Sequence, residues 1–188
     1  MKTKIHNDKA SRLVNCGEVI LLSCGYQGKT TITTCAWHMP LSKAPPLLAV
    51  ALAKGHFSSE LINKSREFVV NIPQWALLDK VMFCGSVSGR KIDKFKASEF
   101  TPQKAAALKE SPKIKECIAN VECKLHDAKE AGDHFVFLGE IVYAEAEEAY
   151  FINDLWDTNK IDLIFHLGGK FFFKSMPYLE AKTKEAKP

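Results

Sequence analysis

The sequence predicts a mainly β protein: an antiparallel barrel, closed or partly closed, with a few helices at its periphery. Strand-like segments follow one another at short spacing, helical segments are few, and strands and helices do not alternate regularly. The 188 residues, 46% of them hydrophobic, can bury a full core. No repeat or Gly-, Ser- or Pro-rich linker divides the chain. We therefore expect one domain over residues 1–188, ending in a disordered or extended tail over about residues 180–188.

Local sequence patterns place four strands and one helix in the N-terminal half. Apolar and β-branched runs flank the turn Tyr26–Lys29, which indicates a pair of strands. Ala44-Pro45-Pro46 prevents a helix and leads into a short apolar run that suits a strand buried on both faces. Ser58 or Ser59 is a suitable N-cap for the helix. We expect strands over residues 18–25, 30–35, 47–52 and 67–72 and a helix over residues 56–65.

The clearest pattern in the C-terminal half is the alternation of apolar and polar residues over 119–126. Odd positions are apolar and even positions are polar, which is typical of a half-buried antiparallel strand. Its expected partner is a long strand over 134–143, reached through a turn at 130–133. We also expect short helical insertions over residues 74–83 and 101–110 and a last strand over residues 170–173.

Charge and cysteine content exclude several classes of protein. A net charge of +4, from 26 Lys and Arg against 22 Asp and Glu, is too small to indicate a nucleic-acid partner. No apolar stretch approaches the roughly 20 residues of a membrane helix. The six cysteines form no C-x-x-C pair and have no histidine at zinc-ligand spacing, so we expect no metal site. An even number of cysteines is compatible with disulfide bonds, but reduced, mostly buried thiols in a cytoplasmic protein are the favoured interpretation.

Four segments are candidates for a ligand site, and each also has a purely structural interpretation. The threonine-rich residues 30–37 fit either an edge strand or a strand end that lines a planar polar ligand. The turn Lys54–Ser59, which includes His56, fits either a Ser-capped helix or an anion site at a helix start. The loop Cys84–Phe95 fits either a solvated basic loop or an oxyanion site, and His166 occupies a tight turn at 166–171. Catalytic triads, P-loops and dinucleotide fingerprints are absent from the sequence.

Taken together and in this order, these motifs resemble the flavin reductase-like family of FMN-binding split barrels, and within it the flavoredoxin-like branch. The longest motif is the loop Cys84–Phe95, and the resemblance covers nearly the whole chain. The chain departs from many relatives at Thr31, where they carry Asn, and at Ala44, where they carry Asp. The other matching motifs are Thr34-Cys35-Ala36-Trp37, Pro45-Pro46, Phe57-Ser58, Val70-Asn71-Ile72-Pro73 and His166-Leu167-Gly168-Gly169.

The resemblance implies an antiparallel split β-barrel that forms a homodimer, with one FMN at each subunit interface. Carried over by motif position, the isoalloxazine ring would lie along Thr33, Thr34, Cys35, Ala36 and Trp37. The phosphate and ribityl end would contact Lys54, Ser58, Ser59, Ser88, Gly89, Arg90 and Lys94. His166 would lie near the ring face, and no other catalytic side chain is implied.

The resemblance also implies an oxidoreductase or electron carrier. Electrons or hydride would pass through bound FMN, in a flavoredoxin-type carrier or an NAD(P)H:flavin or ferric reductase. NAD(P)H would be a transient co-substrate, or a protein electron carrier would be the partner; we expect no nucleic-acid or membrane partner. Two alternatives remain at this stage: a non-redox barrel that binds a small anion or nucleic acid, and a structural dimer that has lost its flavin site.

Overall fold

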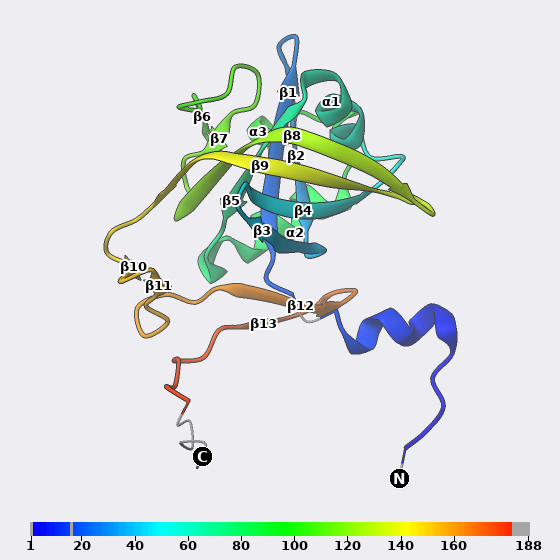
Figure 1. Ribbon diagram of the computed structural model, residues 1–188, viewed down its shortest axis with the longest axis vertical. Coiled ribbons are helices and arrows are strands. Elements are labelled where there is room, and N and C mark those ends of the chain that lie inside the picture. Colours follow the sequence, from blue (N-terminus) through cyan, green and yellow to red (C-terminus); the bar gives the residue numbers. More distant parts are fainter. Residues whose placement is uncertain (1, 16, 182–188) are drawn as a thin grey trace.

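A computed structural model of the chain describes residues 2–15 and 17–181. From residue 182 onward, the expected C-terminal tail lies outside the described residues. One seven-stranded sheet dominates the fold, with the strand order β2-β1-β5-β8-β9-β4-β3 and every neighbouring pair antiparallel (Figure 1). Its strands are β1 (Ile20–Tyr26), β2 (Lys29–Cys35), β3 (His38–Lys43), β4 (Pro46–Ala53), β5 (Glu67–Ile72), β8 (Ala119–Ala131) and β9 (His134–Ala146).

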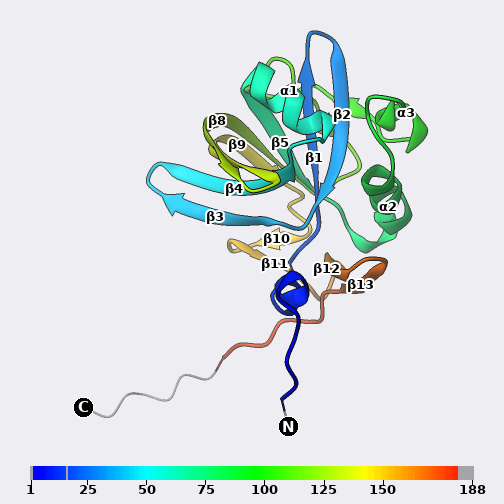
Figure 2. The same ribbon diagram turned by 90° about the vertical axis from the view of Figure 1, so that its right-hand side faces the viewer.

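Short elements surround this sheet. The hairpin β12–β13 and the N-terminal segment lie together at one end of the barrel (Figures 1 and 2). The helices are η1 (Asn7–Leu13), α1 (Phe57–Ser65), η2 (Trp75–Leu77), α2 (Leu78–Ser86) and α3 (Lys94–Ala97). The remaining strands are β6 (Pro102–Gln103), β7 (Lys113–Ile114), β10 (Phe151–Ile152), β11 (Leu155–Trp156), β12 (Ile164–Gly168) and β13 (Phe171–Lys174).

The sheet curls until its two ends approach each other. The two edge strands, β2 and β3, are joined by residues 36 and 37, and there the N–H of Ala51 on β4 donates a hydrogen bond to the carbonyl of Trp37 at 2.8 Å. The thiol of Cys35 on β2 also points toward the carbonyl of Ala51. The predicted mainly β, antiparallel barrel with few helices is therefore confirmed, and its incomplete closure creates an opening between β2 and β4.

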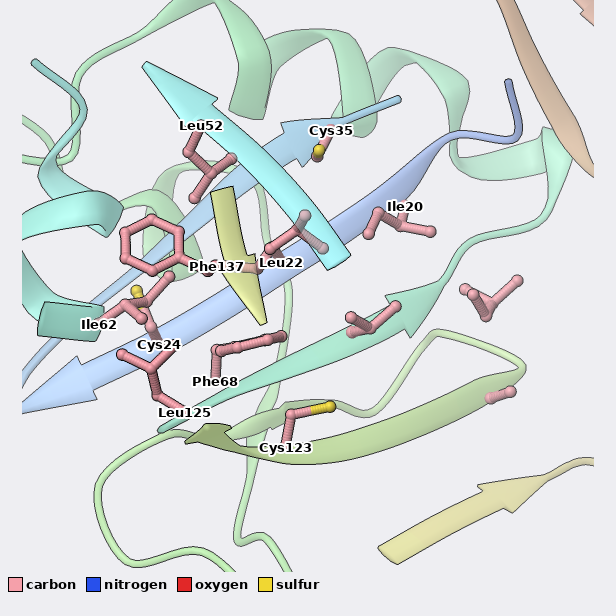
Figure 3. Packing of buried hydrophobic residues seen from close by; sticks show 14 of the residues in the cluster. Ile20, Leu22, Cys24, Cys35, Leu52, Ile62, Phe68, Cys123, Leu125 and Phe137 are labelled. Carbon is pink, nitrogen blue, oxygen red and sulfur yellow. The ribbon is translucent and has the colours of Figure 1, made fainter. Parts of the chain in front are cut away.

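Both faces of β1 are buried, which explains its unbroken apolar run. Ile20, Leu22 and Cys24 point into the barrel, where they pack with Phe68 and Phe137 (Figure 3). Leu21, on the other face of β1, belongs to a second cluster outside the barrel, beneath α2 and α3. Members of that cluster are Val19, Leu21, Ile32, Val81, Cys84, Phe95 and Phe100. The two layers fix β1 and β2 between the barrel interior and the helices that cover them.

Most predicted elements of the sheet are confirmed, but β3 was missed. No strand was expected over residues 38–43, whereas His38 begins a strand that pairs with β4. Its residues are mostly exposed and include a proline, so no apolar alternation indicates it. The expected last strand forms as β13, and the predicted turn before it contains Gly168 and Gly169 with positive φ angles.

The helix predicted over residues 101–110 is wrong. The chain there forms the two-residue strand β6 followed by an irregular loop. Buried carboxylates bind the loop's N–H groups: Glu122 accepts from Ala106 and Ala107, and Glu67 accepts from Glu110 and Ser111. Backbone donors held by distant side chains cannot form the hydrogen bonds of a helix.

The burial of β8 also differs from the prediction. Its polar residues Asn120 and Glu122 are buried, although alternation predicted that they face solvent. Asn120 donates to Asn71 Oδ1 at 2.8 Å, and Asn71 in turn donates to the carbonyl of Leu21 at 2.9 Å. Alternation holds only from Cys123 onward, where Lys124 and His126 are exposed and Leu125 is buried.

Five of the six cysteines lie in the described part of the chain, and all five are free and buried: Cys24, Cys35, Cys84, Cys117 and Cys123. The prediction of reduced, buried thiols therefore holds for these five, and Cys16 lies outside the described residues. Among the described residues, no helix is both long and apolar enough to cross a membrane.

Candidate functional site

Two adjoining cavities lie where β2 and β4 separate. The strand-end cavity has a volume of about 410 Å³, and the helix-start cavity, of about 330 Å³, lies beside the beginning of α1. Thr34 and His56 line both, so the cavities meet at these two residues. The strand-end cavity is lined by Lys9, Ser11, Arg12, Asn15, Val19, Thr34, Cys35, Ala36, Trp37, Ala51, Leu52, Ala53, His56, His134, His166, Gly169 and Phe172.

On the walls that β2 contributes, most threonine hydroxyls are already hydrogen-bonded within the protein, which leaves mainly backbone groups for a ligand. Thr33 Oγ1 donates to Ser58 Oγ at 2.8 Å, and Thr34 Oγ1 donates to the carbonyl of Val81 at 2.6 Å. Burial raises the pKa of the Cys35 thiol to about 11, so this thiol is neutral near pH 7. The exception is Thr31, which lines the helix-start cavity: its Oγ1 is buried and has no hydrogen-bond partner in the described part of the chain.

The beginning of α1 forms one wall of the helix-start cavity. The helix starts at Phe57 after His56, and no side chain caps its first N–H groups. Because these N–H groups lack partners within the helix and lie at its positive end, they favour an anion. The expected Ser caps are wrong: Ser58 accepts from Thr33, and Ser59 donates to the carbonyl of Ala53 at 2.9 Å.

The loop between α2 and α3 forms the opposite wall. Gly85, Ser88, Gly89 and Lys94 all line the helix-start cavity. Lys94 is only 5% exposed, donates to the carbonyl of Cys84 at 2.5 Å and forms no ion pair with the side chains that the structure describes. Burial lowers its pKa. A buried ammonium group without a carboxylate partner is costly unless an anion binds beside it.

Burial shifts the pKa values of the titratable groups near the point where the two cavities meet. The pKa of His56 is lowered by burial and then by the positive charges of Lys94, His134 and Arg90. The pKa of the Cys84 thiol is raised by burial, although it lines the same cavity as Lys94. Neutral Cys84 is thus a poor nucleophile, and the positive charge at this site comes from Lys94.

A family model described as the flavin reductase like domain matches residues 13–162. The chain belongs to the flavin reductase-like domain family. It is 33% identical to the uncharacterized protein YddH of Escherichia coli over 88% of this chain and 90% of that one. The flavoredoxin structure of Methanosarcina acetivorans matches with a TM-score of 0.86 and 31% identity, covering 98% of this chain and 97% of that one. The flavoredoxin structure of Desulfovibrio vulgaris (Miyazaki F) matches with a TM-score of 0.85 and 25% identity, covering 99% of each chain.

These matches confirm the resemblance to the flavoredoxin branch and the split-barrel fold that the sequence predicted. In this flavin reductase-like domain, the structure brings most of the predicted site residues to the two cavities. Ser58 and Ser59 lie inside α1 with buried hydroxyls. The residues that line a cavity are Thr33, Thr34, Cys35, Ala36, Trp37, Ser88, Gly89, Lys94 and His166.

Two predicted phosphate ligands of the flavin reductase-like domain lie elsewhere. Lys54 lines neither cavity, because its Nζ pairs with Glu130 at 2.6 Å and lies over the ring of Phe135. Arg90 faces a neighbouring cavity of about 550 Å³ and is held by Glu60 at 2.9 Å and by the carbonyl of Gly55 at 2.8 Å. Both positions follow the family motif, but their side chains are engaged by acidic groups.

Sequence reasoning missed Asn15, which joins two predicted residues. Trp37 Nε1 donates to Asn15 Oδ1 at 2.7 Å, and Asn15 Nδ2 lies 3.4 Å from Nδ1 of His166. The Trp37 ring, 46% exposed, lies 5.0 Å from the ring of His134. No sequence signal points to Asn15 or His134, since both reach the cavity only through the fold.

Proposed function

We propose that the protein binds FMN in these two cavities and passes electrons or hydride through it. The observation that carries the proposal is Lys94, a buried ammonium group with no carboxylate partner among the described residues, facing the uncapped start of α1 across one cavity. A phosphate there would form an ion pair with Lys94 and accept hydrogen bonds from the N–H groups of the helix. The unpartnered hydroxyl of Thr31 in the same cavity supplies one more donor.

The flavin ring would occupy the strand-end cavity. Thr34 and His56 line both cavities, so one ligand can extend from the helix start to the end of β2. Residues 34–37 of this cavity's lining come from the end of β2 and the chain just after it, and His166 lines the same cavity. When bound, FMN supplies a ring that accepts hydride or electrons at N5.

The chain's own residues would bind and orient the flavin. Lys94 neutralises the phosphate, and the tight approach of Gly89 to Thr31 leaves the loop's backbone close to the ligand. Asn15 fixes the indole of Trp37 and the imidazole of His166 relative to each other. None of these roles needs a side chain that exchanges a proton, which agrees with the absence of a catalytic triad motif in the sequence.

We favour a flavoredoxin-type electron carrier over an NAD(P)H:flavin or ferric reductase. The likeness to two flavoredoxins over nearly the whole chain supports this choice. The test is the visible spectrum of the purified protein after FMN addition, recorded under nitrogen before and after NADH or NADPH. Flavin bands with little bleaching by either nucleotide are expected, and rapid bleaching would favour the reductase. If FMN does not bind, the proposal fails. The matches to known proteins lend no support to a non-redox binding module.

A homodimer is part of the proposal. The surface around β13 and the following chain is apolar, with exposed Phe171, Phe173, Met176, Tyr178 and Leu179. Beside it, Trp75, Leu163 and Phe165 line an apolar groove of about 750 Å³. Exposed patches of this kind mark association surfaces. Sedimentation equilibrium should give twice the chain mass, whereas a monomer at micromolar concentration would contradict the dimer.

The proposal also places the protein in the cytoplasm as one domain. The five free, buried cysteines support a reducing compartment. NAD(P)H, docking transiently over the flavin, or a protein electron carrier would be the redox partner.

A further inference from the structure

The outer wall of the strand-end cavity is basic. Lys9, Arg12 and Asn15 contribute to this wall from the N-terminal segment, and His166 contributes from the hairpin β12–β13. None of the described residues that line this cavity is Asp or Glu. Charged side chains of one sign around a cavity attract ligands of the opposite sign. The wall is therefore suited to a ligand that carries negative charge.

Arg12 is positioned at this wall by contact with the hairpin turn. A Cβ atom at Gly168 would lie 2.0 Å from Arg12 Nη1 and 3.1 Å from its Cζ, so the guanidinium packs directly on the backbone of Gly168. Gly168 has a φ of +128°, a conformation that side chains rarely adopt. The turn thus provides both the space and the surface that hold the guanidinium at the cavity.

The charge of Arg12 is not neutralised by the chain as described. Arg12 forms no ion pair with any side chain that the structure describes, although the chain has several exposed acidic residues elsewhere. The phosphate of FMN does not account for it either, since the groups suited to that phosphate are Lys94 and the start of α1 in the other cavity. A guanidinium group binds carboxylate and phosphate through paired hydrogen bonds.

We propose that Arg12 is a specificity residue for the second ligand, which docks beside the flavin ring and carries a carboxylate or a phosphate. This inference rests on the proposed FMN binding, because the ring forms the floor against which the second ligand lies. The guanidinium holds the anionic group at the outer wall, and the rest of the ligand lies along the ring. A neutral ligand of the same shape loses that contact.

The test uses FMN-loaded protein and ligand pairs that differ in one anionic group. Benzoate is compared with benzamide, and nicotinamide mononucleotide with nicotinamide riboside, by the change that each causes in the flavin absorption spectrum. In the wild type, we expect the anionic member of at least one pair to bind about tenfold more tightly or better. R12Q should reduce that preference to about twofold or less, whereas R12K should retain most of it.

A control variant distinguishes a direct contact between Arg12 and the ligand from a general electrostatic attraction by the positively charged protein. Lys43 on β3 is exposed and lines neither cavity, so K43A removes one positive charge elsewhere and should leave the preference unchanged. A preference in only one pair identifies the anion as carboxylate or phosphate. Equal binding within both pairs, or a preference that survives R12Q, overturns the inference while FMN binding stands. Failure of the wild type to take up FMN overturns both.

Discussion

Gly89 lies directly against the side chain of Thr31: a Cβ atom at residue 89 would be 2.1 Å from Thr31 Oγ1. That hydroxyl is buried and has no hydrogen-bond partner in the described part of the chain. An unsatisfied buried polar group costs about 1–3 kcal/mol, and a ligand that accepts its hydrogen bond recovers this cost. Thr31 Oγ1 is therefore an unsatisfied buried donor in a residue that lines the cavity proposed for FMN.

T31V should separate ligand binding from folding. Valine keeps the shape of threonine and removes the orphan hydroxyl, so the free energy of unfolding of the FMN-free protein should stay the same or rise by about 1 kcal/mol. FMN affinity should fall about tenfold, because the ligand loses a donor. Urea denaturation and FMN fluorescence titration measure the two quantities.

T34V is the matched control for this substitution. The hydroxyl of Thr34 already donates to the carbonyl of Val81 at 2.6 Å, so its removal should destabilise the FMN-free protein by about 1 kcal/mol. FMN affinity should change less than in T31V. Unchanged affinity in T31V would show that its hydroxyl does not contact the ligand.

K94M should weaken FMN binding without weakening the fold. Burial of the ammonium group lowers the pKa of Lys94, which shows that the FMN-free protein bears a cost for this charge. Methionine removes that cost, so the free energy of unfolding without FMN should not fall by more than about 1 kcal/mol. FMN affinity, measured by fluorescence titration, should fall about 10- to 100-fold with the lost charge-assisted hydrogen bond.

K54M tests the other lysine that the family motif assigns to the phosphate. Its Nζ pairs with Glu130 at 2.6 Å and lines neither cavity, so FMN affinity should change by less than about twofold. An equal loss in K54M and K94M would contradict the position of the phosphate in the helix-start cavity.

The sheet could be predicted because its signals are local. Strands β1, β2 and β5 are short apolar or β-branched runs bounded by turns, and the pairing of β8 with β9 follows from one turn between two long strands. The false helix over residues 101–110 shows the limit. Its N–H groups bind Glu67 and Glu122, which lie far away in the sequence, and no local pattern reveals such partners.

Motif position predicted the residues of the candidate site, but it does not show which partners their side chains find in the fold. The loop motif singled out Ser88, Gly89 and Lys94, and the structure places all three along one cavity. The same reasoning assigned Lys54 to the phosphate, but its side chain pairs with Glu130 at the end of β8. Asn15 was missed because it carries no motif and reaches His166 only across the fold.

E18Q should stabilise the FMN-free protein at neutral pH but not at acidic pH. Burial raises the pKa of Glu18 from 4.5 to about 7, and its Oε1 has no partner among the described residues. Between these values the folded state binds more protons than the unfolded state, so Glu18 lowers stability as the pH rises from 4.5 through 7. Glutamine cannot ionise. Relative to wild type, the stabilisation should grow from near zero at about pH 4.5 to about 3 kcal/mol at about pH 8.

The measurement for Glu18 is urea denaturation of both proteins at the two pH values. E148Q serves as the control, because Glu148 is exposed and should give no pH-dependent difference. A stabilisation of E18Q that is equal at both pH values would show that ionisation of Glu18 is not its cause.

E122Q should release one part of the loop that replaces the predicted helix. Fully buried Glu122 accepts from the N–H groups of Ala106 at 2.7 Å and Ala107 at 2.6 Å, through separate carboxylate oxygens. Glutamine has one acceptor oxygen, and its amide nitrogen would face an N–H donor, so we expect a loss of about 2 kcal/mol in stability. Hydrogen exchange should quicken at residues 106 and 107. E67Q should instead quicken exchange at residues 109–111, whose N–H groups bind the two carboxylate oxygens of Glu67. Identical exchange patterns in the two variants would mean that the loop opens as one unit, and that neither carboxylate holds its own segment independently.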